Sequence, residues 1–319
     1  MKLISWDEVH RFGDYAAVVE ALGTMYRSGC DVIKRMDMIQ PTVDGDEADC
    51  LLQPAWMRGR AFGVKIANVF PKNEELRGMP SILGLYLLFD GNTGEPLACI
   101  DGPAETMIKT ACNSAFASQL LSRADSSTLL MMGAGRLAPY LIGAHRAVRP
   151  IRRVLIWNRT RAKAQELARR MNETEAIHEA VSDLGAAVQA ADVISCATYA
   201  DAPILPGKWL KPGAHVDLVG SYRPDQREAD DEVAVRAKRL FVDARISTIE
   251  ISADCIDPIA KGLLKRDEVA DLFEVAQGKA PGRRSSSDIT LFKSGGGGHE
   301  DLATALLIYQ RSLAEASAP

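Results

Sequence analysis

The first third of the chain combines helical and strand-like spacing of its hydrophobic residues. Over residues 14–29 apolar side chains recur at helical spacing, which predicts an amphipathic helix that ends in a glycine. Residues 63–69 and 81–89 are apolar runs bounded by polar or glycine-containing segments, and each predicts a strand. The turn-forming segment 90–96 separates the second run from a third at 97–100, so a hairpin is expected. This region is therefore expected to fold as α+β.

After Pro103 the spacing changes to a regular alternation of helices and strands. Helices are predicted at 105–122, 137–148, 161–171 and 301–313, and apolar strands at 127–132, 153–157, 192–196, 215–219 and 240–242. Strands that alternate with helices in this way form a parallel sheet. The sequence therefore predicts a second, α/β architecture for this part of the chain.

A glycine-rich turn connects the strand at 127–132 to the helix that follows it. In Gly133-x-Gly135-x-x-Ala138, the first glycine permits a tight turn, the second lets the backbone approach a pyrophosphate, and the alanine keeps helix and strand close. The N–H groups at the helix start face the phosphates, and Arg136 can add a contact. A structural turn with a coincidental glycine pair is the alternative, which the regular alternation disfavours. These features predict an NAD(P)-dependent oxidoreductase.

The end of the next strand bears on the choice of cofactor. In NAD-binding units an acidic residue usually holds the adenosine ribose there. This chain has Asn158-Arg159-Thr160 instead, and an arginine with polar neighbours can bind a 2′-phosphate. NADPH is therefore favoured over NADH, although such loops also accommodate NADH.

Length and composition limit the classes of protein to which this chain can belong. The 319 residues exceed the usual size of a single core, so two domains are expected. A hydrophobic fraction of 47% and a net charge of -4 argue against a disordered chain and against a broad nucleic-acid-binding surface. The six cysteines have no metal-ligand spacing, so no metal is expected. With no signal-like N-terminus and no apolar run of about 18 residues, the expected location is cytoplasmic, without membrane contact.

Cationic residues outside the glycine turn are candidates for binding a carboxylate. They are Arg35, Lys65, Lys109 and Lys293. An isolated lysine or arginine is most often a solvated surface charge, and a lysine on an apolar helix can extend its amine to water. Taken one at a time, these residues favour a structural interpretation.

Five segments together resemble the ornithine cyclodeaminase/mu-crystallin family over nearly the whole chain. They are 63–73 (GVKIANVFPKN), 88–94 (LFDGNTG), 108–115 (IKTACNSA), 133–138 (GAGRLA) and 289–295 (ITLFKSG). The resemblance implies a homodimer, in which residues 1–115 and 297–319 form an α+β domain for substrate binding and dimerisation. It also implies an NAD(P)-binding Rossmann domain at 116–296, a doubly wound parallel sheet inserted in the smaller domain, so the fold class is α/β. The active site is expected between the domains.

By position, the resemblance places Arg35, Lys65 and Lys109 around the substrate carboxylate, with Ser81 beside them. Many family members carry arginine where this chain has Lys109, so a bidentate clamp is replaced here by a point charge. The expected cofactor contacts are Thr110, Gly133, Ala134, Gly135, Arg136, Leu137, Ala138, Asn158, Arg159, Thr160, Ala197, Thr198, Val219, Gly220 and Ser221.

A second departure from the family bears on the reaction. Ornithine cyclodeaminases of the family have an acidic residue after a glycine pair, and Tyr222 occupies that place here. Without this carboxylate, cyclodeamination lacks its expected base. Segment 221–228 instead resembles the mu-crystallin branch, which includes ketimine reductases, and this implies NAD(P)H-dependent hydride transfer to the C=N bond of a carboxylate-bearing imine. The alternatives are a cyclodeaminase-type lyase, an alanine dehydrogenase and a ligand-binding protein without activity.

Two further hypotheses concern single residues. Lys65 is expected to double as proton donor to the imine if neighbouring cations and partial burial lower its pKa. His299 follows four glycines, where the family usually has a bulkier and apolar loop, and this leaves space for a second substrate carboxylate, as in iminosuccinate. The alternative is a histidine that caps or flanks the final helix.

Overall fold

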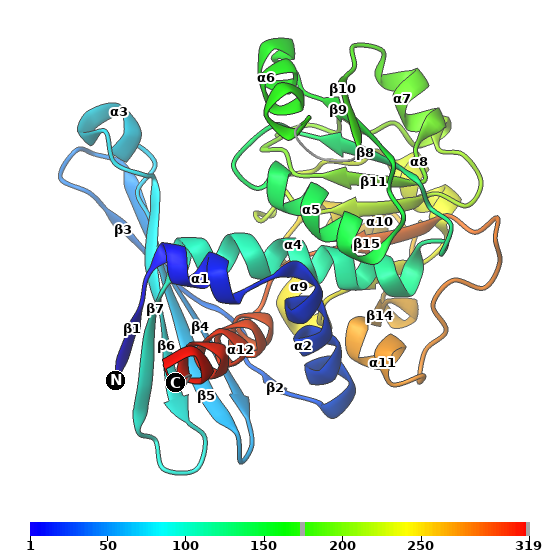
Figure 1. Ribbon diagram of the computed structural model, residues 1–319. Helices are drawn as coiled ribbons and strands as arrows, with labels where there is room; N and C mark the ends of the chain where they lie inside the picture. The colour runs from blue at the N-terminus through cyan, green and yellow to red at the C-terminus, as the bar shows by residue number, and fades with distance from the viewer. Residues whose placement is uncertain (173–175, 317–319) are drawn as a thin grey trace. The chain divides into compact units, whose positions relative to one another are not determined.

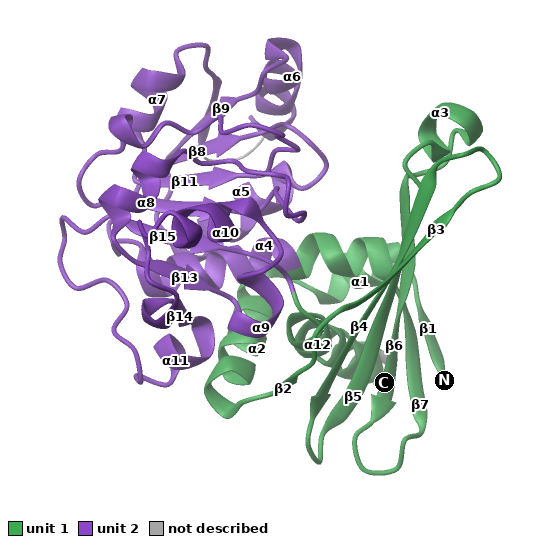
Figure 2. Ribbon diagram, turned by 180° about the vertical axis from the view of Figure 1, so that it is seen from behind, with its two compact units in different colours: residues 1–109, 297–319 green, residues 110–296 purple. Residues whose placement is uncertain are grey.

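The computed structural model describes residues 1–172 and 176–316 (Figure 1). The chain divides into two compact units (Figure 2): unit 1 is Met1–Lys109 with Gly297–Pro319, and unit 2 is Thr110–Gly296. The first boundary lies within helix α4 (Gly102–Leu121), and the boundary suggested by the sequence, after residue 115, lies further along this helix. Residues 173–175 and 317–319 of the expected domains lie outside the described residues. Unit 2 is thus inserted in the chain of unit 1.

Unit 1 is built on a seven-stranded sheet of order β1-β7-β6-β5-β4-β2, with β3 also paired to β4. Its strands are β1 (Lys2–Ile4), β2 (Asp31–Val32), β3 (Met36–Pro41), β4 (Glu47–Met57), β5 (Ala61–Val69), β6 (Ile82–Asp90) and β7 (Pro96–Asp101). β1 and β7 are parallel, and the other pairs are antiparallel. The pairing of β6 with β7 confirms the predicted hairpin.

Unit 1 also contains helices. They are α1 (Trp6–Phe12), α2 (Tyr15–Ser28), α12 (Gly298–Ala316) and the first part of α4, while the short α3 (Asn73–Arg77) lies between β5 and β6. α12 contacts β4, β5 and β6 as well as α2. Asp14 caps the start of α2 by accepting a hydrogen bond from the N–H of Ala17, and Gly29 follows its last residue. The predicted N-terminal helix is therefore confirmed.

The start of α12 lies close to β4. A Cβ on Gly298 would lie 2.7 Å from the carbonyl oxygens of both Gln53 and Pro54, so only glycine allows this approach. The approach brings the first turn of α12 to Lys65 of β5. Because side chains alternate along a strand, Ile66 points to the opposite face of the sheet.

Unit 2 contains an eight-stranded, wholly parallel sheet of order β10-β9-β8-β11-β12-β15-β13-β14. Its strands are β8 (Thr128–Met132), β9 (Arg153–Trp157), β10 (Ile177–Ala180), β11 (Val193–Cys196), β12 (His215–Leu218), β13 (Leu240–Val242), β14 (Ala270–Asp271) and β15 (Thr290–Lys293). The chain moves outward from β8 to β10 and returns to β11 on the other side of β8, as in a Rossmann fold. The predicted doubly wound α/β architecture is confirmed.

The connections in unit 2 are mostly helical. The helices are α5 (Ala138–Val148), α6 (Arg161–Met171), α7 (Leu184–Ala190), α8 (Asp231–Ala237), α9 (Arg245–Thr248), α10 (Ala253–Ala260) and α11 (Leu272–Ala276), with 3-10 turns at Gly207–Trp209 and Arg266–Glu268. Right-handed crossovers place α5 and α6 on one face of the sheet and α7 on the other. Apolar strand residues such as Leu130, Ile194 and Val216 are buried in the core.

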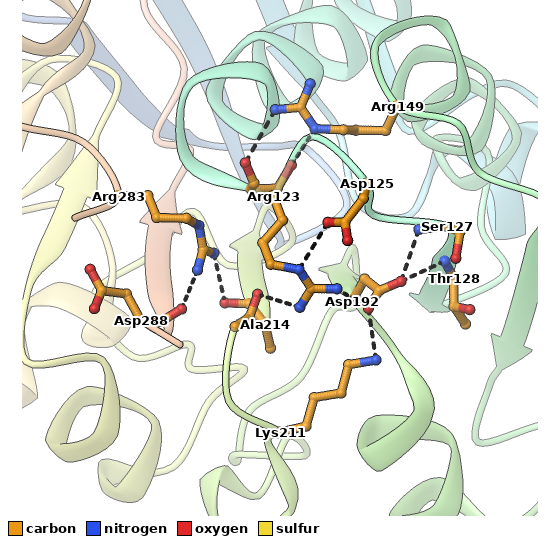
Figure 3. A network of polar contacts seen from close by, with 12 residues as sticks. Arg123, Asp125, Ser127, Thr128, Arg149, Asp192, Lys211, Ala214, Arg283 and Asp288 are labelled. Atoms are coloured by element: carbon orange, nitrogen blue, oxygen red, sulfur yellow. Dashed lines mark hydrogen bonds and ion pairs between the residues drawn. The ribbon is translucent and has the colours of Figure 1, made fainter. Parts of the chain in front are cut away.

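A polar network joins the amino ends of β8 and β11 (Figure 3). The Asp192 carboxylate accepts hydrogen bonds from the N–H groups of Ser127 and Thr128 at 2.8 and 3.0 Å. It also pairs with Arg123 at 2.9 Å and with Lys211 at 2.7 Å. These charges are paired with one another at the end of the sheet opposite the glycine turn, so we assign the network to stabilising the sheet.

Parts of the fold differ from the sequence-based expectations. β3 and β4 had no predicted counterpart, and α3 lies in a segment expected to be a polar connection. α12 begins before the predicted start at residue 301, so His299 lies in its first turn. Of the helices that the structure describes, none is long and apolar enough to cross a membrane.

Candidate active site

The glycine turn after β8 leaves room for a phosphate group. Gly133 has a φ of +105°, and a Cβ there would lie 2.4 Å from the carbonyl oxygen of Ala197. Gly135 is exposed, and a Cβ built on it would meet no atom within 4 Å. α5 begins directly afterwards, at Ala138, with its positive end at this turn. Gly133 and Gly135, together with Ala134, Leu137 and the exposed Arg136, form a turn that fits the pyrophosphate of a dinucleotide.

The end of β9 borders the same turn. Asn158 Oδ1 accepts a hydrogen bond from the N–H of Ala134 at 3.2 Å, and Asn158 Nδ2 donates to the carbonyl of Thr160 at 3.0 Å. Asn158 therefore links the two loops. Arg159 and Thr160 are exposed and can contact a ligand.

The loops after β11 and β12 meet around a buried carboxylate. Glu228 Oε1 accepts hydrogen bonds from the N–H and the hydroxyl of Thr198, at 2.8 and 2.7 Å. Glu228 Oε2 accepts from the N–H of Gly220 at 2.7 Å. Burial raises the pKa of Glu228 to about 7, although the Lys293 ammonium opposes this rise. Lys293 is itself buried and donates to the carbonyl of Leu218 at 3.2 Å. Of the other expected cofactor residues, Ala197 and Val219 lie in these loops and are partly exposed.

In unit 1, Lys65 and Lys109 meet at one carboxylate oxygen. Lys65 Nζ donates to Asp301 Oδ1 at 3.0 Å, and Lys109 Nζ lies 3.2 Å from the same oxygen. Lys109 Nζ also donates to Glu300 Oε2 at 2.9 Å. All four side chains are buried. The lysines are therefore held by carboxylates. Neighbouring cations were expected around Lys65, and its neighbours are the Lys109 ammonium and also the Asp301 carboxylate.

Charges in this cluster shift the pKa of Lys109. Burial disfavours its ammonium, but the carboxylates of Asp301 and Glu300 outweigh burial and raise the pKa of Lys109 above its usual value. Lys109 is therefore charged at neutral pH.

Glu105, in the first turn of α4, adds another carboxyl group to the cluster. It is fully buried, and no protein donor in the described ranges reaches either of its oxygens. Burial and the negative charge of Asp301 raise the pKa of Glu105 well above its usual value. A carboxylate that is buried without donors is costly to ionise, so the protonated form is favoured. We therefore assign Glu105 as a neutral carboxylic acid at neutral pH.

His299 is packed into the interior of unit 1. Its Nε2 lies 3.3 Å from the hydroxyl of Tyr26, and the two rings meet edge to face with 5.6 Å between their centroids. The side chain is fully buried. This packing favours the alternative in which His299 belongs to the start of α12.

The remaining predicted residues have other local partners. Arg35 pairs with Asp37 at 2.7 Å. Ser81 precedes β6, and its carbonyl accepts a hydrogen bond from the N–H of Phe70 at 2.8 Å. Thr110 follows Lys109 on α4 and is partly buried. The structure thus brings Lys65 and Lys109 together and shows Arg35 in a separate ion pair.

Four acidic residues that had no predicted role lie at these sites. They are Glu105, Glu228, Glu300 and Asp301. The sequence does contain a signal for Glu300 and Asp301, which are adjacent acids at the start of an otherwise apolar helix. Acidic residues in such a helix are seldom buried without partners, so cationic partners could have been sought for them. Within residues 1–172 and 176–316, no group of three or more His, Cys, Asp or Glu side chains is placed to hold a metal ion.

Comparison with known proteins gives one consistent result. The family model for ornithine cyclodeaminase/mu-crystallin matches residues 8–316. A Delta(1)-pyrroline-2-carboxylate reductase of Paracoccus denitrificans is 43% identical over 256 residues, which cover 80% of each chain. The enzyme of that name from Colwellia psychrerythraea is 33% identical over 318 residues, 98% of this chain and 99% of the relative. The Thermococcus litoralis Delta(1)-pyrroline-2-carboxylate reductase, solved with NADH and L-proline, has a TM-score of 0.91 at 30% identity and covers 99% of this chain and 98% of its own. This chain therefore belongs to the ornithine cyclodeaminase/mu-crystallin family.

Proposed function

We propose that the protein is an imino acid reductase that uses NAD(P)H to reduce the C=N bond of a carboxylate-bearing cyclic imine to an L-amino acid. The favoured substrate is Delta(1)-pyrroline-2-carboxylate, whose reduction gives L-proline. Similarity along the full chain to a reductase of this substrate carries the proposal. The open glycine turn of unit 2 and the lysine–carboxylate cluster of unit 1 supply the chemistry that such a reaction needs.

The cluster residues have separate roles in this proposal. Lys65 and Lys109 hold the substrate carboxylate, while Asp301 keeps both ammonium groups in place. A bound nicotinamide cofactor supplies the hydride. Protonation of the imine nitrogen makes its carbon a better hydride acceptor. Lys65 is the proposed proton donor, because its side chain is the ammonium partner of Asp301 in an ion pair.

Charge balance favours a substrate with a single carboxylate. The proposal assigns both lysines of this cluster to one substrate carboxylate, and in the described chain the cluster holds no third lysine for a second carboxylate. His299, the other candidate for that contact, is buried against Tyr26. A cyclic ketimine with one carboxylate therefore fits better than iminosuccinate.

NADPH is the proposed preferred cofactor. The exposed side chains of Arg159 and Thr160, at the end of β9, support this preference because they can bind a 2′-phosphate. Asn158 is engaged in linking the loops, so Arg159 carries most of the expected discrimination.

Oxidation of the reduced cofactor tests the proposal. NADPH and NADH are each offered with the pyrroline, its six-membered-ring analogue, iminosuccinate, and pyruvate with ammonia, and ornithine is offered separately with the oxidised cofactor. We expect the highest kcat/KM with the pyrroline and NADPH, and L-proline as product. Conversion of ornithine to proline without net oxidation would indicate a lyase instead, and cofactor binding without turnover would indicate a binding protein.

A single variant tests the role of Lys65 in the same assay. Lys65→Met removes the ammonium but leaves Lys109 to pair with Asp301, so the cluster keeps one cation. We expect kcat/KM to fall by about 100-fold or more, with cofactor affinity unchanged. Near-normal turnover by the folded variant would exclude Lys65 as proton donor.

We further propose that two copies of the chain pair through the sheet of unit 1. Met36, Leu52, Ile66 and Leu85 are successive cross-strand partners on β3, β4, β5 and β6. They form an apolar row on the face opposite α12, since Lys65 points to α12 and Ile66 points away. Met36 and Leu85 are 53% and 48% exposed, and an exposed apolar row of this kind is typical of a protein–protein interface.

A further inference from the structure

The carboxylate of Glu228 joins two loops that follow different strands. The loop after β11 contributes the N–H and the hydroxyl of Thr198, and the loop after β12 contributes the N–H of Gly220. Both oxygens of the buried Glu228 side chain accept these hydrogen bonds, so donors from both loops converge on one group. The spacing of the two loops is therefore set by Glu228.

Glu228 is itself held in place through its backbone. Its N–H donates to Asp254 Oδ1 at 3.0 Å, and its carbonyl accepts from the N–H groups of Ile204 and Leu205, both at 2.9 Å. Asp254, near the start of α10, also accepts a hydrogen bond from the hydroxyl of Ser221, the neighbour of Gly220. The carboxylate thus extends from a rigid support.

Strand order places these loops relative to the glycine turn. β11 is the neighbour of β8 on the side away from β9, and β12 follows it. In an open α/β sheet, ligands bind outside the carboxyl ends of the strands, at the point where the strand order reverses. A dinucleotide with its pyrophosphate at Gly135 and its adenosine towards β9 extends its nicotinamide half over the loops after β11 and β12. Thr198 and Gly220 are partly exposed and can face such a ligand, whereas Glu228 is fully buried.

We propose that Glu228 is a positioning residue for the nicotinamide ring. It holds Thr198 and Gly220 at the spacing that the ring requires, without touching the cofactor. This inference rests on the proposed dinucleotide function and extends it, because it assigns the alignment of the ring to a residue outside the contact surface. Alignment matters, since a misplacement of about 1 Å can cost on the order of 100-fold in rate.

Glu228→Gln, in the full-length protein, tests the inference by ligand binding. The amide group keeps the size of the side chain, but its NH₂ must face a donor of either Thr198 or Gly220, so one loop loses its acceptor. Calorimetry measures the affinity for two ligands. The first is NADH or NADPH, whichever the wild type binds more tightly. The second is the matching fragment without nicotinamide, which is ADP-ribose for NADH and 2′-phospho-ADP-ribose for NADPH. We expect about tenfold weaker binding of the cofactor and unchanged binding of the fragment.

Asp217→Asn is the matched control. Asp217 is also a buried carboxylate of unit 2, and it accepts hydrogen bonds from the hydroxyls of Ser114 and Ser195, at 3.0 and 2.6 Å. It lies within β12 and not in the loop beyond it, so its variant should bind both ligands as the wild type does. Glu228→Asp keeps the charge but is too short to reach both loops, and we expect a smaller loss that is again confined to the cofactor.

The outcomes separate this inference from the proposed function. Equal weakening of cofactor and fragment by Glu228→Gln, or no weakening of either, would overturn the positioning role and leave the dinucleotide function standing. A wild-type protein that binds neither NADH nor NADPH would overturn both.

Discussion

Asp301 determines how the two lysines of unit 1 are presented. Burial alone would raise the pKa of Asp301, but the charges of Lys109 and Lys65 outweigh burial and lower it. Asp301 therefore remains ionised between two ammonium groups, and removing either partner from such a buried group is costly. The cluster is a preassembled charged unit, in which a substrate carboxylate has to compete with Asp301 for the lysines.

Glu105 gives a prediction for the pH dependence of stability. Its pKa in the folded protein is raised above the unfolded value near 4.5, so its contribution to stability is complete below that value and is lost as pH rises towards the folded pKa. Glu105→Gln mimics the protonated form and cannot ionise. We expect the variant to match the wild type in free energy of unfolding below about pH 4 and to exceed it at alkaline pH.

Urea unfolding at several pH values measures this difference. Glu95→Gln, on an exposed turn of the same unit, is the control and should leave the pH profile of the wild type unchanged. A Glu105→Gln variant whose stability runs parallel to that of the wild type at all pH values would show that Glu105 is ionised in the fold.

At the scale of single residues, the lysines of the cluster could be identified from the sequence, but the carboxyl groups around them could not. Lys65 and Asp301 are 236 positions apart, and no spacing rule connects a strand residue to a helix so distant in the chain. Their contact depends on the close approach of Gly298 to β4, which is a property of packing. Glu105 lies in a mostly apolar helix, where a single acid carries no periodic signal.

Among the strands of unit 2, the ends of β8 and β11 are joined by Asp192. Burial alone would raise the pKa of this carboxyl, but the Lys211 ammonium and the N–H groups of Ser127 and Thr128 lower it to about 2. The resulting stability is present above the unfolded value near 3.8 and is lost as pH falls through about 2. This shift corresponds to about 2 kcal/mol at neutral pH.

Asp192→Asn removes the charge and one acceptor from this network. We expect the free energy of unfolding of unit 2 to fall by about 2 kcal/mol at pH 7, and by much less near pH 2. Glu179→Gln provides the comparison, since Glu179 pairs with Arg153 at the protein surface and its loss should cost well under 1 kcal/mol. Equal effects of the two substitutions at pH 7 would contradict the assignment.

The elements that were predicted best have strong periodic signals. β8, β9, α5 and α6 begin and end within one residue of the predicted ranges, because short apolar strands alternate there with amphipathic helices. β3 is exposed along its whole length, and its residues alternate between apolar and polar only from Met36 to Met38, which is too short a signal for a half-buried strand. β4 contains Pro54, which argues against a strand when only the sequence is considered.

On the scale of the whole molecule, the presence of two architectures was predictable because the hydrophobic pattern changes after Pro103. Resemblance to the family supplied the insertion, which no local pattern encodes. The same resemblance supplied the homodimer, for which the apolar row on the sheet of unit 1 gives independent support. The exposed positions at the two ends of this row make the pairing testable.

Leu85→Lys places a charge at one end of the row. If two copies meet through this face, the ammonium would be buried against apolar side chains at a cost of several kcal/mol, so dimerisation should weaken by about 100-fold or more. Sedimentation equilibrium measures the change. Ile177→Lys is the control, since Ile177 is 62% exposed on β10 of unit 2 and should leave the dimer intact. A Leu85→Lys protein that stays dimeric would place the interface on another surface, and a monomeric wild type would remove the dimer altogether.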